Sequence, residues 1–151
     1  MNSVYSHARK FKKKYPLTIA WRLKKHSKII QDHLNPGETV RYAFACQKGP
    51  HSYMMSSFVV AVTDRRLLLA TKRMLFGYFY YSITPDMYND LQVRMGLLWG
   101  HVVIDTAKEE IILTHLSKKA LQEIETQITD FMINEKKLYK ILEDKAKKGK
   151  K

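Results

Sequence analysis

The sequence lacks the features that form disulfides or insert a protein into a membrane. With one cysteine, Cys46, it cannot form an internal disulfide, so we predict a reducing compartment and a small buried thiol. No apolar run approaches the roughly 18 residues of a membrane span, and no apolar stretch follows the basic amino terminus as in a signal peptide. These absences predict a cytoplasmic protein, with peripheral attachment at the inner face of the membrane left open.

Catalytic groupings are also missing from the sequence. The six histidines show no metal-ligand spacing, and one cysteine offers no thiolate cluster. Gly96 and Gly100 lack the lysine and hydroxyl residue of a phosphate-binding loop. Asp86 and Asp90 stand four residues apart, but they flank Pro85 in a predicted surface turn, where solvated carboxylates are expected. We therefore predict a non-enzymatic protein with no cofactor and no metal site.

Acidic residues are scarce: 14 Asp and Glu face 27 Lys and Arg, which gives a net charge of +13. Residues 34–116 have eight basic against seven acidic groups, whereas residues 1–15 have five basic groups and none that is acidic. Such basic runs are most often solvated, mobile tails, and polyanion binding is the alternative. The candidate polyanion-binding residues are Arg9, Lys10, Lys12, Lys13, Lys14, Arg22, Lys24, Lys25 and Lys28.

Two different segments are predicted before the first strand. Residues 1–15 lack apolar periodicity, so they are predicted to form a basic flexible arm, disordered or loosely helical, that ends at Pro16. Ala20, Leu23, Ser27 and Ile30 then recur at three- and four-residue steps, which predicts an amphipathic helix over residues 18–33. A basic amphipathic helix either covers a core or lies on an anionic membrane. We favour the first alternative because the predicted sheet needs a cover.

The predicted sheet is centred on a hairpin. Two apolar runs, residues 58–62 and 66–70, flank the turn formed by Thr63, Asp64 and Arg65. Apolar side chains occupy both faces of these strands, so the sheet must be covered on both sides. Further strands are predicted at residues 39–46, 78–83, 91–95, 102–105 and 109–116. About seven antiparallel strands at close spacing within residues 39–116 are typical of a small barrel or sandwich.

A long final helix is predicted over residues 118–145, with Ser117 as its N-cap. Its apolar positions, from Leu121 to Leu142, recur at three- and four-residue steps. At 1.5 Å per residue it would be about 42 Å long, more than the height of a small barrel. Its C-terminal half must therefore stand free, pack on the first helix or join a second protomer as a homo-oligomer. The predicted organisation is one domain over residues 16–146, followed by a Lys-rich tail at residues 147–151.

Four groups of residues occur along the chain in an order that is typical of a known family. They are Leu34, Pro36, Gly37 and Glu38 before the first strand, Thr63, Asp64, Arg65, Arg66 and Leu67 at the hairpin, Gly77 before the fourth strand, and Gly96 and Gly100 near the sixth. Over roughly residues 30–145, this order resembles the bacterial pleckstrin-homology-like domains of the YokE-like type. The resemblance implies an α+β fold, a PH-like barrel of two strongly bent antiparallel sheets capped by the last helix. It implies a platform for lipids, peptides or assembly, and no particular chemistry.

The hairpin motif has a local explanation. Thr63 and Asp64 can hydrogen-bond backbone groups of the turn, and Arg65 and Arg66 are expected near Asp64 at the surface. We predict that the motif closes a hairpin, with ligand binding as the alternative.

The mouth of the barrel offers few basic groups. Lys48 and His51 lie in or beside the first hairpin loop, and Lys72 and Arg73 end the third strand. A specific phosphate pocket requires several converging donors, so diffuse attraction to an anionic surface is favoured over head-group recognition. The predicted function is a non-enzymatic interaction module for an anionic membrane surface or a protein partner, through the basic N-terminal segment and helices. Nucleic-acid binding, with stacking on the aromatic strand at residues 78–81, is the alternative.

Overall fold

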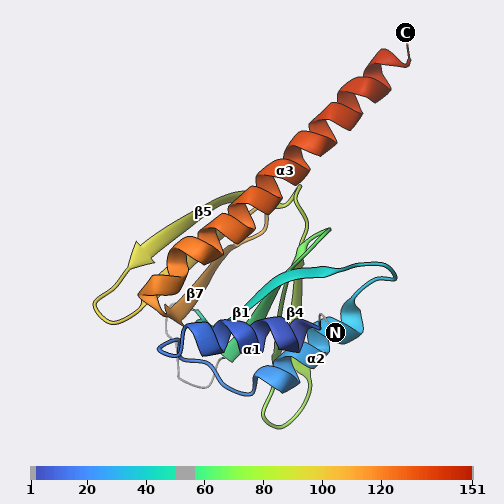
Figure 1. Ribbon diagram of the computed structural model, residues 1–151. Coiled ribbons are helices and arrows are strands. Elements are labelled where there is room, and N and C mark those ends of the chain that lie inside the picture. The colour runs from blue at the N-terminus through green and yellow to red at the C-terminus, as the bar shows by residue number, and fades with distance from the viewer. Residues whose placement is uncertain (1–2, 50–56, 151) are drawn as a thin grey trace.

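The computed structural model describes residues 3–49 and 57–150. In these residues three α-helices and a short 3-10 helix accompany seven strands (Figure 1). The elements are α1 (Val4–Lys14), α2 (Leu23–His33), β1 (Val40–Lys48), β2 (Ser57–Thr63), β3 (Leu67–Lys72), β4 (Tyr78–Ile83), β5 (Tyr88–Met95), β6 (Gly100–Thr106), β7 (Glu110–Leu116), η1 (Lys118–Ala120) and α3 (Leu121–Lys148).

The seven strands form one antiparallel sheet in the order β4-β3-β2-β1-β7-β6-β5. Strand β1 joins its two halves, because β1 pairs with β2 over most of its length but with β7 only at Gln47 and Lys48. The strands on either side of β1 therefore diverge into two layers (Figure 1). The predicted α+β architecture, with seven antiparallel strands and a long C-terminal helix, is confirmed.

The central hairpin is β2 and β3, and all seven residues of β2 are buried. Val60 lies opposite Leu69, and Ala61 lies opposite Leu68. Since neighbouring side chains on a strand point to opposite faces, the first pair enters one apolar core and the second pair enters another. The predicted cover on both sides of the sheet is confirmed.

Different helices cover the two cores. Helix α3 closes the first core with Ile124, Ile128 and Met132, all fully buried. Helices α1 and α2 cover the other face with a second set of apolar side chains, among them Val4 and Ile30. The N-terminal helices thus belong to the body of the fold.

The prediction of a flexible arm at residues 1–15 is wrong. Residues 4–14 form helix α1, whose Val4, Ala8 and Phe11 are buried. The Phe11 ring enters the first core, with its centroid 5.1 Å from that of Tyr15 and 5.8 Å from that of Phe44. The Ser3 side chain caps the helix by accepting the Ser6 N–H at 3.1 Å. The apolar stripe was overlooked because one small and two larger apolar residues are spaced among many basic ones.

Helix α2 begins five residues later than the predicted start at residue 18. The preceding coil, residues 16–22, is tied to the sheet instead: the Ile19 N–H donates to the His115 carbonyl, and the Ser117 N–H donates to Thr18 Oγ1. Lys12 Nζ donates to the carbonyls of Pro16 and Thr18. These bonds satisfy the Ile19 N–H and the carbonyls of Pro16 and Thr18 without a helix, so the apolar periodicity before Leu23 was misleading.

Helix α3 follows the 3-10 helix η1. Ser117 is the N-cap residue of η1, at the predicted start of the last element, but its side chain makes no capping hydrogen bond. Buried residues end at Met132. Beyond that residue the helix projects from the sheet (Figure 1), with Leu138 and Leu142 exposed. In the described residues this half does not pack on the first predicted helix, α2, and its association with a second protomer stays a prediction.

Candidate anion-binding surface

The strands converge at one end of the sheet to form the candidate surface. Lys48 ends β1, and Lys72 at the end of β3 pairs with Tyr78 at the start of β4. Residues 73–77 close this β3–β4 hairpin, where the Arg73 N–H donates to the Gly77 carbonyl at 3.1 Å. Gly77 has a φ of 74°, a left-handed conformation that favours glycine. Lys72 and Arg73 are thereby placed at the base of a tight turn.

The turn presents apolar side chains to solvent. Leu75 is 86% exposed and Phe76 is 84% exposed, and Met74 beside them is also exposed. We call these three residues the hairpin tip. Large apolar side chains grouped at a protruding turn point to an interaction site.

A cavity of about 470 Å³ lies beside the hairpin tip, and four basic residues line it: Arg22, Lys48, Lys72 and Arg73. Lys48 Nζ lies 4.1 Å from the ring centroid of Tyr81, and Arg73 Cζ lies 4.5 Å from that of Phe79. Arg22 Nη1 donates to the Lys72 carbonyl at 3.1 Å. None of the described residues that line this cavity is acidic, so its walls combine positive charge with aromatic rings.

A second cavity of about 470 Å³ adjoins the first through Lys72 and is also lined by Lys25 and Lys28 of α2. It includes one acidic residue, Asp32, which pairs with Lys28 at 2.8 Å. The two cavities together define what we call the basic patch: Arg22, Lys25, Lys28, Lys48, Lys72 and Arg73.

The structure brings together only some of the residues that the sequence singled out. Lys48, Lys72 and Arg73 do converge at the mouth, and Arg22 joins them from the coil before α2. His51 lies outside the described residues. Lys24 is exposed on α2 and lines a third cavity with Lys25 and Lys28.

The basic residues of α1 are divided in their roles. Lys14 forms an ion pair with Glu123 of α3 at 2.7 Å, and Lys12 holds the following coil. Arg9, Lys10 and Lys13 are exposed on the same helix. Lys12 and Lys14 therefore contribute to the fold, and the other three basic residues of α1 are exposed.

The hairpin tip itself was missed. The available signal was a predicted turn that contains Met74, Leu75 and Phe76 directly after two basic residues. Surface turns are ordinarily polar, so three consecutive apolar residues in a turn indicate an interaction site.

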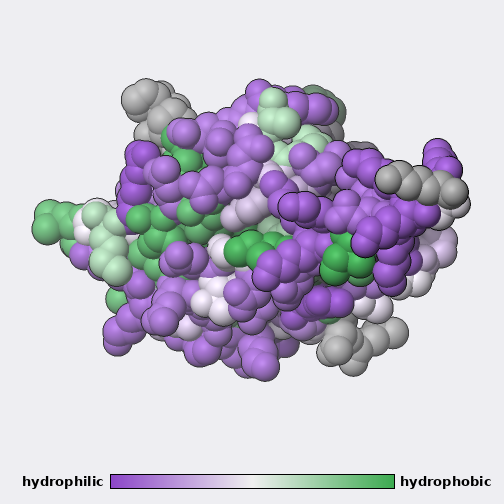
Figure 2. Space-filling model, turned by 90° about the horizontal axis from the view of Figure 1, so that it is seen from above, coloured by the Kyte–Doolittle hydropathy of each residue, from purple (hydrophilic) through white to green (hydrophobic). Residues whose placement is uncertain are grey.

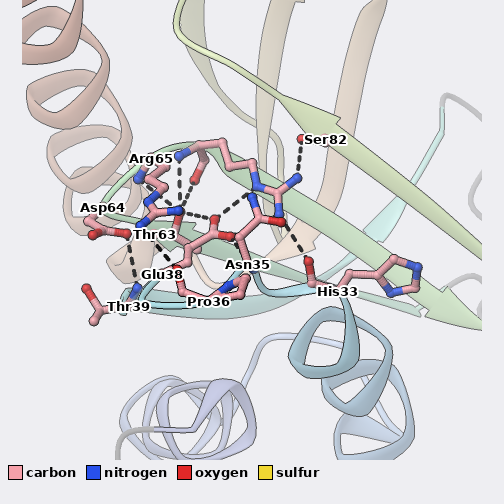
Figure 3. Close-up of polar contacts among 10 residues, drawn as sticks. His33, Asn35, Pro36, Glu38, Thr39, Thr63, Asp64, Arg65 and Ser82 are labelled. Carbon is pink, nitrogen blue, oxygen red and sulfur yellow. Dashed lines mark hydrogen bonds and ion pairs between the residues drawn. The ribbon is translucent and has the colours of Figure 1, made fainter.

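The family-like hairpin motif forms an internal lock (Figure 3). Arg66 Nε and Nη2 donate to the two carboxylate oxygens of Glu38, each at 2.9 Å, and Nη2 also donates to the His33 carbonyl. Thr63 Oγ1 donates to Glu38 Oε1 at 2.8 Å and accepts the N–H groups of Arg65 and Arg66. The lock joins the end of α2, the start of β1 and the β2–β3 turn.

These bonds correct part of the sequence interpretation. Thr63 closes the turn as predicted, but Asp64 Oδ1 accepts the Thr39 N–H at 3.0 Å, outside the turn. Arg66 does not lie beside Asp64 at the surface, because it pairs with the buried Glu38. Burial would raise the pKa of the Glu38 carboxyl, but the hydrogen bonds from Arg66, Asn35 and Thr63 outweigh it and lower that pKa to about 2. The motif's polar groups are thus committed to the fold.

A buried histidine fastens α2 beneath the basic patch. His26 Nδ1 accepts the Lys72 backbone N–H at 2.7 Å, so that the ring must be neutral at this atom. Burial, with the charge of Arg22 as a smaller cause, lowers the pKa of His26 from 6.5 to about 4. The end of β3 therefore depends on an uncharged imidazole.

Acidification should destabilise the protein through His26. Its folded pKa lies below its unfolded value, so the stability is complete above pH 6.5 and is lost as the pH falls towards 4. Between pH 7.5 and 5.0 we expect His26 to account for a loss of about 2 kcal/mol in the free energy of unfolding, measured by urea denaturation. His26→Gln keeps an acceptor without a titrating ring and should flatten this dependence; an equal loss in that variant would contradict the assignment.

Other chemistry finds little support among the described residues. They include no group of three or more His, Cys, Asp or Glu side chains that could hold a metal ion. None of their helices is both long enough and apolar enough to cross a bilayer.

One of the comparisons with known proteins matches a family model. The family model described as Bacterial PH domain matches residues 34–130. A DUF1696 family protein with a pleckstrin-homology domain from Shewanella loihica PV-4 is 15% identical at a TM-score of 0.46, over 76% of this chain and 92% of that chain. A pleckstrin homology domain from Shewanella amazonensis SB2B is 18% identical at a TM-score of 0.44, over 72% and 85%. No curated protein matches the sequence.

Proposed function

Since the chain belongs to the bacterial PH domain family, we propose that it is a non-catalytic module that attaches peripherally to anionic membrane surfaces through its basic patch and hairpin tip. The family match does not select the YokE-like type within that family. A PH fold supports many functions, so the proposal rests on the surface itself.

The observation that supports this function is the composition of the β3–β4 hairpin. Its tip exposes Leu75 and Phe76, and Lys72 and Arg73 stand at its base. Apolar area gains about 25 cal/mol per Å² when it leaves water for the acyl boundary. Basic side chains near an anionic surface add about 1 kcal/mol each. The hairpin combines both contributions within five consecutive residues, with the charges placed where the headgroups would lie.

The aromatic residues of β4 support the membrane over nucleic acid. A stacking platform requires a free ring face, but the rings here have other neighbours: Lys48 lies over Tyr81, Arg73 lies over Phe79, and the Tyr80 ring stacks on His33 at 4.1 Å. Each of these three rings therefore already has a cation or an imidazole beside it.

Vesicle binding tests this function. The full chain should bind vesicles that contain phosphatidylserine more tightly than vesicles of phosphatidylcholine alone. Lys72→Gln with Arg73→Gln should weaken binding about 30-fold at low salt, since two charges contribute about 2 kcal/mol. The loss should shrink as salt screens the surface. Lys147→Gln with Lys148→Gln, the same change of charge at the exposed end of α3, is the matched control and should have little effect.

Three results would contradict the proposal. Equal losses in the two double variants would mean that net charge alone governs binding. Tighter binding to duplex DNA or single-stranded RNA, with a steep log-log dependence on salt, would favour the nucleic-acid alternative. Binding to neither vesicles nor nucleic acid at near-physiological salt would leave a protein partner as the better explanation of the exposed tip.

A further inference from the structure

A second apolar projection lies at the turn between β5 and β6. The turn is closed by the Gly96 N–H, which donates to the Trp99 carbonyl at 2.8 Å. Leu97 is 91% exposed and Leu98 is 68% exposed, and Met95 at the end of β5 is exposed too. We call Leu97 and Leu98 the second tip. In Figure 2 hydrophobic surface reaches the left edge of the molecule, where Figure 1 shows the β5–β6 turn.

The coil at residues 16–22 connects this turn with the hairpin tip. Trp99 Nε1 donates to the Leu17 carbonyl at 3.1 Å, and the Leu17 side chain is 70% exposed. At the other end of the coil Trp21 is 43% exposed. The next residue, Arg22, lies against the hairpin tip, with its Nη1 3.2 Å from Met74 Sδ. Exposed apolar side chains therefore occur at both ends of one coil that joins the two turns.

Positive charge accompanies the second tip as it does the first. Lys118 Nζ donates to the Leu97 carbonyl at 2.6 Å. Lys119, the next residue, and Arg94, near the end of β5, are both exposed. Leucines at a protruding turn with lysines behind them match the order of layers at an anionic bilayer, where acyl chains lie below the phosphates. Tryptophan prefers the headgroup level, which suits the position of Trp21 between the tips.

Figure 1 shows the β5–β6 turn at the left edge of the molecule and the β3–β4 turn at its bottom. Both lie on the side away from the projecting end of α3, with the coil running beneath the sheet between them (Figure 1). We propose that the β5–β6 turn is a second membrane anchor, which enters the same bilayer face as the hairpin tip while the coil lies along the headgroups. This inference rests on the proposed attachment to anionic membranes, and it adds a fixed orientation: two separated anchors prevent the domain from rotating about one hairpin.

Site-specific fluorescence tests the second anchor. An environment-sensitive dye is attached to Leu75→Cys, Leu97→Cys or Lys147→Cys in the full chain. The native Cys46 is fully buried, and burial raises the pKa of its thiol, so it should remain unlabelled; unlabelled wild type verifies this. Phosphatidylserine vesicles should shift the emission at positions 75 and 97 to the blue and leave position 147 unchanged.

Affinity provides the second measurement. Leu97→Ser with Leu98→Ser should weaken vesicle binding about tenfold or more, because two apolar side chains no longer enter the bilayer. Both residues are exposed, so the unfolding midpoint should not change. Urea denaturation of this variant checks that its midpoint equals that of the wild type.

The outcomes separate this inference from the function on which it rests. A shift at position 75 without one at position 97 would overturn the second anchor and leave hairpin attachment intact. Vesicle binding that is absent altogether, with no shift at either position, would overturn both. If the Leu97 and Leu98 change lowers the mass of a self-associated species and spares vesicle binding, the second tip is an interface between copies and the inference is wrong.

Discussion

Replacing Glu38 with alanine is expected to cost about 3–5 kcal/mol of folding free energy, the range for removing one partner of a buried ion pair. The Glu38 side chain is fully buried and that of Arg66 is 15% exposed. Alanine would leave the guanidinium without its bidentate carboxylate, and Thr63 Oγ1 and the Asn35 N–H would each lose an acceptor. The segment before β1 would lose the bonds through which Glu38 joins it to the β2–β3 turn.

Urea denaturation of Asp32→Ala gives the matched comparison. Asp32 also accepts from a basic side chain, at 2.8 Å from Lys28 Nζ, but that pair is exposed and should contribute less than about 1 kcal/mol. Equal losses for the two variants would show that burial of the Glu38 pair has no special importance. Because the Glu38 pKa is about 2, its contribution is lost only as the pH falls from 4.5 towards 2, below most of the range from 6.5 to 4 in which His26 acts.

Removing α1 should unfold the protein or leave it marginally stable. Phe11→Ala alone should cost about 3–5 kcal/mol, as for buried aromatic side chains elsewhere. Phe11 enters the first core and Val4 and Ala8 enter the second, so a deletion of residues 1–15 uncovers apolar surface on both faces of the sheet. It also removes the Lys12 bonds that hold the following coil.

Thermal and urea unfolding of the variants measure this effect. Lys13→Ala is the matched control, since Lys13 is exposed on the same helix, and surface changes of this kind are usually within about 0.5 kcal/mol. A deletion variant that unfolds cooperatively at the wild-type midpoint would restore the flexible-arm interpretation and count against the packing of α1.

The sheet could be predicted because its signals are local. The two apolar runs at residues 58–62 and 66–70, on either side of a turn, predicted the hairpin, and turn residues separated the other strands. Helix α1 was not predicted because Val4, Ala8 and Phe11 form a narrow stripe among basic residues that also favour disorder. Helix α1 is buried by contacts with strands that are distant in sequence, and a local sequence pattern does not indicate such contacts.

The candidate surface depends on still longer-range contacts. Arg22 and Lys72 are 50 residues apart in sequence, and Glu38 and Arg66 are 28 apart. The sequence placed Lys48, Lys72 and Arg73 near one mouth because their strands ended there, but it could not show that a coil residue would complete the cavity. The hairpin motif suggested that Arg66 is a surface charge, because its buried partner, Glu38, lies outside the turn that the motif forms.

The projecting part of α3 has a consequence for cooperativity. Its last sixteen residues, 133–148, contribute no buried side chain, whereas the first twelve contribute five to the first core. A helix segment of that length is marginal on its own in water. One continuous helix therefore contains two parts of different stability. Its first half opens only with the domain, while the turns beyond Lys136, whose Nζ donates to the Tyr88 carbonyl, can fray and re-form without disturbing either core. That end of the chain is the place where a tag could be appended or a protease could cut without penalty to the rest.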